Sequence, residues 1–317
     1  MAGVLVVAEL VEGEIAPVSY EVIGAARQLG AGNVTAFVAG TEAQAKDLIA
    51  HGADAAIMGT SAQLQTGLAE AYVPAVVAAI EQSGADIVLI GMSSLGRDLG
   101  PALAFAQKTA VAMECVELNM EGGRLRATRS CYGGSARAEV TWKAPLQIAT
   151  VKAKSFDGLA ADGSRSGTVS SVDAAGEPRV KVLGVEKVES TGVRLEDAAI
   201  VVSGGRGLGD PSAFGMLETL AGALKGAVGA SRAACDLGWY PPSQQVGLTG
   251  KTVSPNLYIA VAISGASQHM AGMAGSKNIV AINKDADANM VKVAKFAIID
   301  DYKKVIPALI EEIKKLP

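Results

Sequence analysis

The sequence predicts an α/β protein made of two consecutive doubly wound domains, each with a mainly parallel β-sheet. Short runs rich in Val, Ile and Ala alternate along the chain with longer segments of helical period, which is typical of repeated βαβ units. The predicted strands are continuously apolar, as expected when helices cover both faces of a parallel sheet. The length of 317 residues also suits two domains.

The first βαβ series accounts for roughly the first third of the chain. We expect strands near Leu5, at 34–38, near Ala55 and at 86–91. The intervening helices are expected after Pro17, from Thr41, after Pro74 and over 97–109. Proline favours a helix start because its missing N–H is not needed there. These elements together predict a parallel sheet covered by helices.

The alternation of strands and helices ends after this first series. Residues 115–148 hold short alternating stretches separated by glycine pairs and Pro145, which favours a β-rich edge that completes the first domain. Residues 155–194 are rich in Gly, Ser, Asp and Glu and carry Pro178, so we expect a linker there, with a strand near 180–188. We therefore divide the chain into domains at 1–190 and 191–317.

A second βαβ series follows. We expect strands at 198–203, 227–231, 257–263 and 279–282, a further apolar run at 296–299, and helices at 211–224, from Ser231 and after Gly265. In a last helix, apolar residues recur at spacings of three and four, opposite charged positions; they are Val305, Ile306, Leu309, Ile313 and Leu316.

Composition excludes several classes of protein. Half of the residues are hydrophobic and the mean hydropathy is +0.30, so the chain can build a large core and is not disordered. The longest apolar stretches are well short of a membrane span, and the first residues read as a strand and not as a signal peptide. The net charge is −4 and the Lys and Arg residues are scattered, so the sequence does not predict a basic surface for nucleic acid. Three widely spaced cysteines favour a reducing compartment, so we expect a cytoplasmic protein without membrane insertion.

Glycine-bearing turns follow the predicted strands of the second series. The carboxyl ends of parallel strands share one edge of a sheet, so these turns should converge and present helix N-termini to an anionic ligand. The turn at 203–209 does not fit GxGxxG, and 245–252 does not fit a phosphate loop in spite of its GKT. Each turn, taken alone, is equally consistent with a plain connection.

Individual side chains in these turns leave two interpretations open. Arg206 contacts a ligand or is a solvated residue of a turn, and Arg232 contacts a ligand or pairs with a surface carboxylate. His269 is one of only two histidines and follows an apolar strand, although a lone histidine is more often structural. Asn283 and Asp301 suit ribose hydroxyls, and Asp300 or Asp301 suits a helix N-cap.

Four consecutive blocks of the second half resemble the flavin-binding domain of the electron transfer flavoprotein alpha subunit family. These blocks are VVSGGRGL, AVGASRAACDLGW, QVGLTGKTVSPNLYIAVAISGASQHMAGM and IVAINKD. The first half is similar more weakly, through 91–108 and 128–135. The resemblance implies one FAD held by a Rossmann-like C-terminal domain, and a beta subunit that completes a heterodimer and carries a second FAD or AMP.

The resemblance also implies the cofactor-binding positions. Arg206, Ser231 and Arg232 would lie near the isoalloxazine, 246–249 would border it with Thr249 near N5, and 264–269 would line its pyrimidine side and the ribityl and phosphate region. Asn283, Asp301 and Tyr302 would hold the adenosine end. The full set is Arg206, Ser231, Arg232, Gln245, Val246, Gly247, Leu248, Thr249, Ser264, Gly265, Ala266, Ser267, Gln268, His269, Asn283, Asp301 and Tyr302.

The function so implied is that of a redox carrier with no catalytic residue. It would take electrons one at a time from acyl-CoA dehydrogenases in fatty acid oxidation and pass them to a quinone oxidoreductase. Arg232 and His269 near the flavin would favour an anionic semiquinone, since charge is stabilised strongly in a partly dry site.

Two alternatives remain. A flavin-bifurcating relative would oxidise NADH and reduce ferredoxin together with an acyl-CoA dehydrogenase, and this chain alone does not decide between them. A deacetylase-like nucleotide-binding module is disfavoured because Cys115, Cys131 and Cys235 lack the paired spacing of a zinc site.

Overall fold

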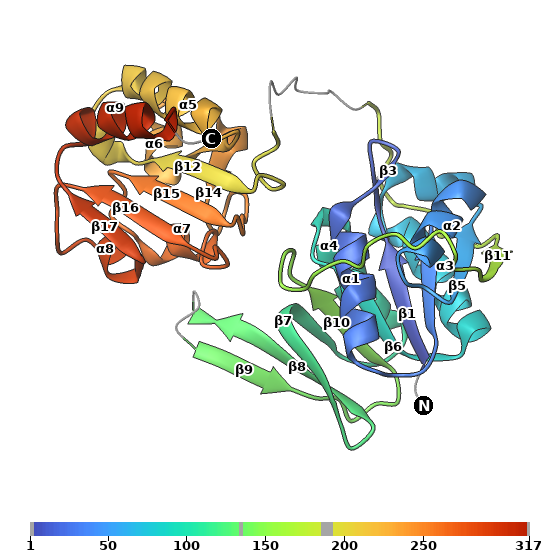
Figure 1. Ribbon diagram of the computed structural model, residues 1–317. Coiled ribbons are helices and arrows are strands. Elements are labelled where there is room, and N and C mark those ends of the chain that lie inside the picture. Colours follow the sequence, from blue (N-terminus) through green and yellow to red (C-terminus); the bar gives the residue numbers. More distant parts are fainter. Residues whose placement is uncertain (1–2, 133–135, 185–192, 316–317) are drawn as a thin grey trace. The chain divides into compact units, whose positions relative to one another are not determined.

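The computed structural model describes residues 3–132, 136–184 and 193–315 and divides into two compact units, 1–185 and 186–317 (Figure 1). Each unit is an α/β structure with a large, mainly parallel sheet, as the sequence predicts. The units are described separately below.

The first unit contains a nine-stranded sheet in the order β11-β5-β4-β1-β6-β10-β7-β8-β9. Its parallel part comprises β1 (Gly3–Ala8), β4 (Val34–Val38), β5 (Ala55–Gly59), β6 (Ala85–Gly91), β10 (Gln147–Val151), β11 (Thr168–Val172) and the start of β7 (Val111–Glu121). β8 (Arg124–Cys131) and β9 (Ala136–Val140) extend the sheet in antiparallel fashion (Figure 1). The predicted β-rich edge is therefore present, with β10 inserted between β6 and β7.

Helices cover both faces of this parallel sheet. α1 (Pro17–Gln28) and α2 (Glu42–Ala50) pack in one hydrophobic cluster, while α3 (Ala69–Ser83) and α4 (Ser94–Ala106) pack in the other. A small hairpin of β2 (Leu10–Val11) and β3 (Glu14–Ile15) and the short η1 (Ala62–Thr66) complete the unit. Continuous burial of strands such as β4 explains their unbroken apolar sequence.

Two helix starts differ from the prediction. α3 begins at Ala69, so Pro74 lies inside the helix and does not start it. The segment around Gly176 packs against the first turn of α3, where the Gly176 amide donates to the carbonyl of Ala71 over 3.0 Å. α4 begins at Ser94 and not at Arg97, because the Ser93 side chain accepts from the Gly96 amide over 3.0 Å and caps the helix.

Much of the segment expected to be a linker belongs to the first unit. β11 pairs with β5 in parallel, and Arg165 Nε donates to the Ile49 carbonyl over 3.1 Å. The strand expected near 180–188 is absent from 180–184, and its remainder lies outside the described residues. The composition of 155–179 is polar because this stretch covers the surface, and its order comes from contacts with helices and strands distant in sequence.

The second unit has a six-stranded parallel sheet in the order β14-β13-β12-β15-β16-β17. The strands are β12 (Ile200–Gly204), β13 (Ala227–Ser231), β14 (Gln245–Val246), β15 (Leu257–Val261), β16 (Ile279–Asn283) and β17 (Phe296–Ile299). Numbered within the unit, this is the order 3-2-1-4-5-6 of a Rossmann fold. The strand order reverses between β12 and β15, which are adjacent.

The two faces of this sheet are covered differently. α5 (Phe214–Ala223), α6 (Arg232–Asp236) and α9 (Tyr302–Ile313) pack in the cluster on one face. The other face is covered mainly by irregular chain, with the short helices α7 (Ser267–Ala271) and α8 (Asn289–Val293). Short 3₁₀ turns, η3 (Arg206–Leu208), η4 (Pro211–Ala213) and η5 (Pro242–Gln244), connect the elements. No described helix is long and apolar enough to cross a membrane.

Candidate functional site

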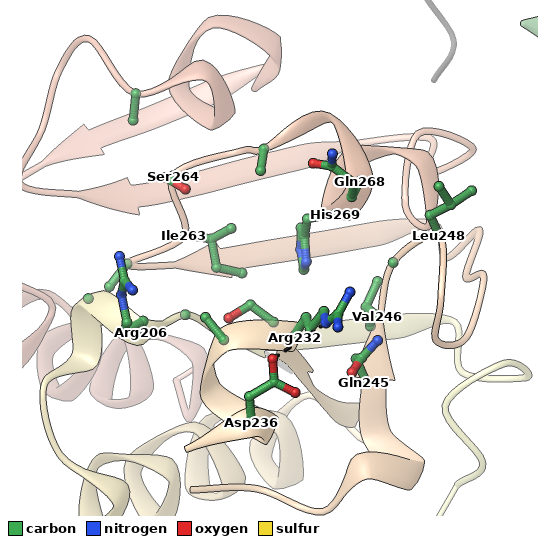
Figure 2. A pocket seen from close by; sticks show the side chains of 18 of the residues that line it. Arg206, Arg232, Asp236, Gln245, Val246, Leu248, Ile263, Ser264, Gln268 and His269 are labelled. Carbon is green, nitrogen blue, oxygen red and sulfur yellow. Dashed lines mark ion pairs between the residues drawn. The ribbon is translucent and has the colours of Figure 1, made fainter. Parts of the chain in front are cut away.

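A cavity of about 650 Å³ lies at the carboxyl ends of the strands of the second unit. It is bordered by the chain that leaves β12 and β15, at the point where the strand order reverses (Figure 2). Ligands of open parallel sheets bind at this position, and the volume is within the usual range for small-molecule sites.

The turn after β12 approaches the chain after β15 very closely. A Cβ on Gly205 would lie 2.2 Å from the carbonyl oxygen of Ala262, and one on Gly207 would lie 2.8 Å from the same atom. Ala262 itself has a φ of 54°, which is uncommon for a residue with a side chain. The glycines therefore leave bare backbone at the cavity wall, and Ala262 carries local strain of the kind found at ligand sites.

Two arginines line the cavity. Arg206 is exposed in η3, and Arg232 is in the first turn of α6, whose N-terminus is capped by the Ser231 hydroxyl. Arg232 Nε lies 3.4 Å from Asp236 Oδ2, so the surface carboxylate partner that the sequence left open is present (Figure 2). Both side chains of this pair are more than 60% exposed, which leaves the guanidinium available to a ligand.

The loop after β14 brings five predicted residues to the cavity. They are Gln245, Val246, Gly247, Leu248 and Thr249. The Gln245 amide Nε2 donates to Thr249 Oγ1 over 3.1 Å, and the Leu248 amide donates to the Gln268 carbonyl over 2.8 Å. These bonds tie the loop to itself and to α7, so it forms a defined edge of the cavity.

His269 reaches the cavity from α7 and is only 7% exposed (Figure 2). Its Nε2 lies 2.9 Å from the hydroxyl of Tyr258, which is fully buried. Burial lowers the pKa of His269 to about 4, and the main chain of Val246 partly opposes this shift. The lowered pKa favours the neutral form of the imidazole at pH 7.

Asn283 holds the chain at the far end of the cavity. Its Nδ2 donates to the Ile263 carbonyl over 3.0 Å, and its Oδ1 accepts from the Asp285 amide over 3.1 Å. Asn283 and Asp285 both line the cavity. The amide of Asn283 thus orients two lining segments, those that follow β15 and β16.

Four residues expected in the site do not line this cavity: Gly265, Ser267, Asp301 and Tyr302. Tyr302 is 5% exposed in the core, and its hydroxyl donates to the Leu208 carbonyl over 2.7 Å. Asp301 caps α9, as the sequence allows, and pairs with Lys284 Nζ at 3.0 Å. Gly265 has a φ of 80° and shapes the turn after β15, where a Cβ would lie 2.3 Å from the Met290 amide nitrogen.

The cavity is also lined by residues outside the predicted set of binding residues. They are Gly205, Gly207, Ala233, Asp236, Ala262, Ile263, Asp285 and Ala288. The two glycines flank Arg206, so the glycine-rich sequence of the turn at 203–209 could have identified them. Asp236 could have been found as the carboxylate four residues after Arg232, whereas Ala262 carries no signal in its residue type.

Comparison with known families identifies both halves of the chain. Residues 4–177 match the electron transfer flavoprotein domain, and residues 194–274 match the electron transfer flavoprotein FAD-binding domain. The second match includes the turns after β12, β13, β14 and β15, and hence most of the cavity wall.

The chain belongs to the electron transfer flavoprotein alpha subunits. It is 39% identical to the electron transfer flavoprotein subunit alpha of Bacillus subtilis, over 99% of this chain and 98% of the relative. Identity to the subunit of the same name from Thermoanaerobacterium thermosaccharolyticum is 42%, over 98% and 97% of the two chains. It is 38% to Protein FixB of Clostridium saccharobutylicum, over 99% and 97%.

The lining suits the flavin that this family's domain binds. The guanidinium groups of Arg206 and Arg232 suit an anionic ligand, bare backbone at Gly205 permits close approach, and the side-chain amides of Gln245 and Gln268 suit the polar edge of a heterocycle. Among the described residues, no group of three His, Cys, Asp or Glu side chains is placed to hold a metal ion. The donor set therefore fits an anionic organic cofactor.

Proposed function

We propose that this chain binds one FAD in the cavity of its second unit and acts, with a beta subunit, as a one-electron carrier between flavoenzymes. The observation that supports this most directly is the position of the cavity. It lies where the strand order of a Rossmann-like sheet reverses, and most of its wall is within the segment that matches the FAD-binding domain.

Bound FAD would supply the reversible electron transfer, and the chain's own residues would hold and tune it. In this proposal Arg206 lies near the isoalloxazine, and the chain from Ser264 to Gln268 accommodates the phosphates and the ribityl chain. Residues 245–249 border the ring, with Thr249 near N5. Asn283, with Asp285 beside it, faces the adenosine end, and the buried side chain of Tyr302 has no part in binding.

Positive charge near the flavin comes from arginine and not from histidine in this site. Arg232 remains charged at any physiological pH, whereas burial keeps His269 neutral. A cation at the ring favours the form of the flavin that carries negative charge, and so raises the potential of its first one-electron reduction. His269 contributes a fixed, neutral, partly polar wall.

The electron partners follow from the family. We propose that acyl-CoA dehydrogenases reduce the flavin and that a quinone oxidoreductase reoxidises it. A partner beta subunit would carry AMP in this case. Oxidation of NADH with reduction of ferredoxin, which would need a second FAD in the partner, is the competing outcome of the test below.

The test is coexpression of this chain with its beta subunit, followed by visible spectroscopy. We expect a flavin band that bleaches stepwise with an acyl-CoA dehydrogenase and its substrate, and almost no bleaching with NADH under anaerobic conditions. Rapid bleaching by NADH would replace the carrier function with the bifurcating one. A complex without any flavin would refute the proposal.

A site-directed control assigns the flavin to this subunit. Gly205→Val places a branched side chain against the Ala262 carbonyl, so we expect it to remove one FAD per heterodimer. Gly215→Val serves as the matched substitution, since no atom lies within 4 Å of a Cβ built there. Unchanged flavin content in the Gly205 variant would place the cofactor elsewhere.

A further inference from the structure

A group of buried polar side chains lies beneath the cavity on the face of the sheet that carries irregular chain. Ser203 is on β12 and Tyr258 on the adjacent β15, and both are 0% exposed. Tyr258 connects to His269 on α7 through its hydroxyl, 2.9 Å from Nε2. Buried polar groups are costly unless they are hydrogen-bonded, so this contact in a hydrophobic core calls for an explanation.

The hydroxyl of Tyr258 has a proton to donate. Burial raises the pKa of Tyr258, with the Ser203 side chain acting in the opposite direction, so the phenol stays protonated. The neutral imidazole of His269 has one N–H and one acceptor nitrogen. A hydrogen bond at Nε2 therefore decides which ring nitrogen carries the proton.

The surroundings of the other ring nitrogen indicate the direction of this bond. Nδ1 is buried and makes no hydrogen bond to any residue in the described part of the chain. The buried phenol of Tyr258 also needs an acceptor for its proton, and its hydroxyl lies 2.9 Å from Nε2. A proton on Nδ1 leaves Nε2 as the acceptor for Tyr258.

We propose that Tyr258 is a positioning residue for His269. Its hydroxyl donates to Nε2, so the neutral ring carries its proton on Nδ1 and the ring plane is held against the cavity. Tyr258 itself has no access to the cavity and acts only through the histidine. The proposal rests on the proposed function for the identity of the cavity's occupant, but the tautomer is a property of this chain.

The tautomer can be read by ¹⁵N NMR of histidine-labelled protein, because the chain has only two histidines. His51→Gln assigns the remaining signals of this chain to His269. The measurement uses the full complex as purified, with unlabelled beta subunit, and again after removal of its cofactor. In the wild type we expect a protonated Nδ1 and an Nε2 that accepts a hydrogen bond. A protonated Nε2 would overturn the proposal.

Tyr258→Phe removes the hydroxyl and keeps the ring that fills the core. We expect the ratio of the two tautomers at His269 to change by roughly three- to tenfold, as for the loss of one hydrogen bond. We also expect the reduction potential of the bound flavin to shift. Tyr240→Phe is the control, because its hydroxyl contacts only Glu218, at 3.3 Å, among the described residues and lies outside the cavity lining.

An unchanged tautomer ratio in Tyr258→Phe would refute the positioning role. The same result in Tyr240→Phe and Tyr258→Phe would also refute it, since a general effect on packing would then explain the change. If the purified complex holds no flavin, the proposed function fails, and the ¹⁵N spectrum of the wild type still decides the tautomer.

Discussion

Charge and hydrogen bonding are assigned to different side chains in the cavity. Arg232 is exposed, paired with Asp236 and always cationic, while His269 is buried, held by Tyr258 and neutral. The family resemblance implies that both residues lie near the flavin. The difference arises from burial, which favours the neutral form of an imidazole and hardly affects a guanidinium at the surface.

Replacing Arg232 with Ala should weaken FAD binding about tenfold or more, since a charge-assisted hydrogen bond is worth roughly 1.5–3 kcal/mol. The flavin potential should fall as positive charge is removed. Stability should stay within about 1 kcal/mol of the wild type, because exposed pairs contribute little. Lys304→Ala breaks an equivalent pair, with Asp300 at 3.5 Å four residues away, outside the cavity lining. Equal flavin affinity in both variants would argue against a role for Arg232.

The lowered pKa of His269 predicts a pH dependence of stability. The unfolded chain binds a proton near pH 6.5 and the folded one only near pH 4, so the unfolded state holds more protons in between. Stability is therefore full above pH 6.5 and is lost as the pH falls toward 4. We expect about 2–3 kcal/mol of this loss at pH 4.5 to be absent in His269→Asn.

Urea unfolding of the flavin-free chain at pH 7.5 and 4.5 provides the measurement. His51→Asn is the control, because it removes the chain's other histidine, at the end of α2. An equal loss of stability on acidification in His269→Asn and the wild type would show that the imidazole is not responsible.

At the level of elements, most helices and strands follow from local signals. The strand at 34–38 and the helix after Pro17 are confirmed, as is the short helix that begins after Ser231. Two helix starts depart from the prediction: a distant segment packs on the first turns of the helix around Pro74, and Ser93 caps α4 three residues earlier than expected. The turns after β12 and β15 depend on both local and distant effects. Their glycines can be recognised in the sequence, but the close contact between the two turns cannot.

Gly205→Ala should destabilise the second unit by about 1–3 kcal/mol, the usual cost of inserting atoms into a packed site. The added Cβ would lie 2.2 Å from a backbone oxygen, which cannot move aside as a side chain can. Gly215→Ala, in α5, should instead stabilise by up to about 1 kcal/mol. Thermal melting together with flavin content checks both. A Gly205→Ala variant as stable as Gly215→Ala would contradict the close approach of the two turns.

For the whole molecule, composition predicts where the first domain ends but does not predict that the expected linker is an ordered part of it. Residues 155–179 are polar and glycine-rich, yet β11 continues the sheet and Arg165 bonds to carbonyls at the end of α2. The compact unit therefore extends to residue 185.

A fragment of residues 1–185 should melt cooperatively, and one of residues 1–154 should melt at least about 4 °C lower, as expected for the loss of 1–2 kcal/mol in a domain of this size. Removing β11 exposes the edge of β5, and removing Arg165 leaves the carbonyls of Ile49 and Ala53 without their side-chain donor. Circular dichroism during heating makes the comparison. Identical midpoints would show that 155–185 is a linker after all.

The sequence by itself determined the α/β class, the parallel sheets and the family. The family resemblance also named most of the residues that line the cavity, and these residues lie together because turns at the ends of parallel strands meet at one edge. Only the tertiary structure decided that Tyr302 is a core residue, that Ala262 lines the cavity, that 155–179 is held by contacts with the sheet and helices of the first unit, and that the pKa of His269 is lowered by burial. These features depend on burial and on contacts between residues far apart in the chain, and neither has a local pattern that marks it.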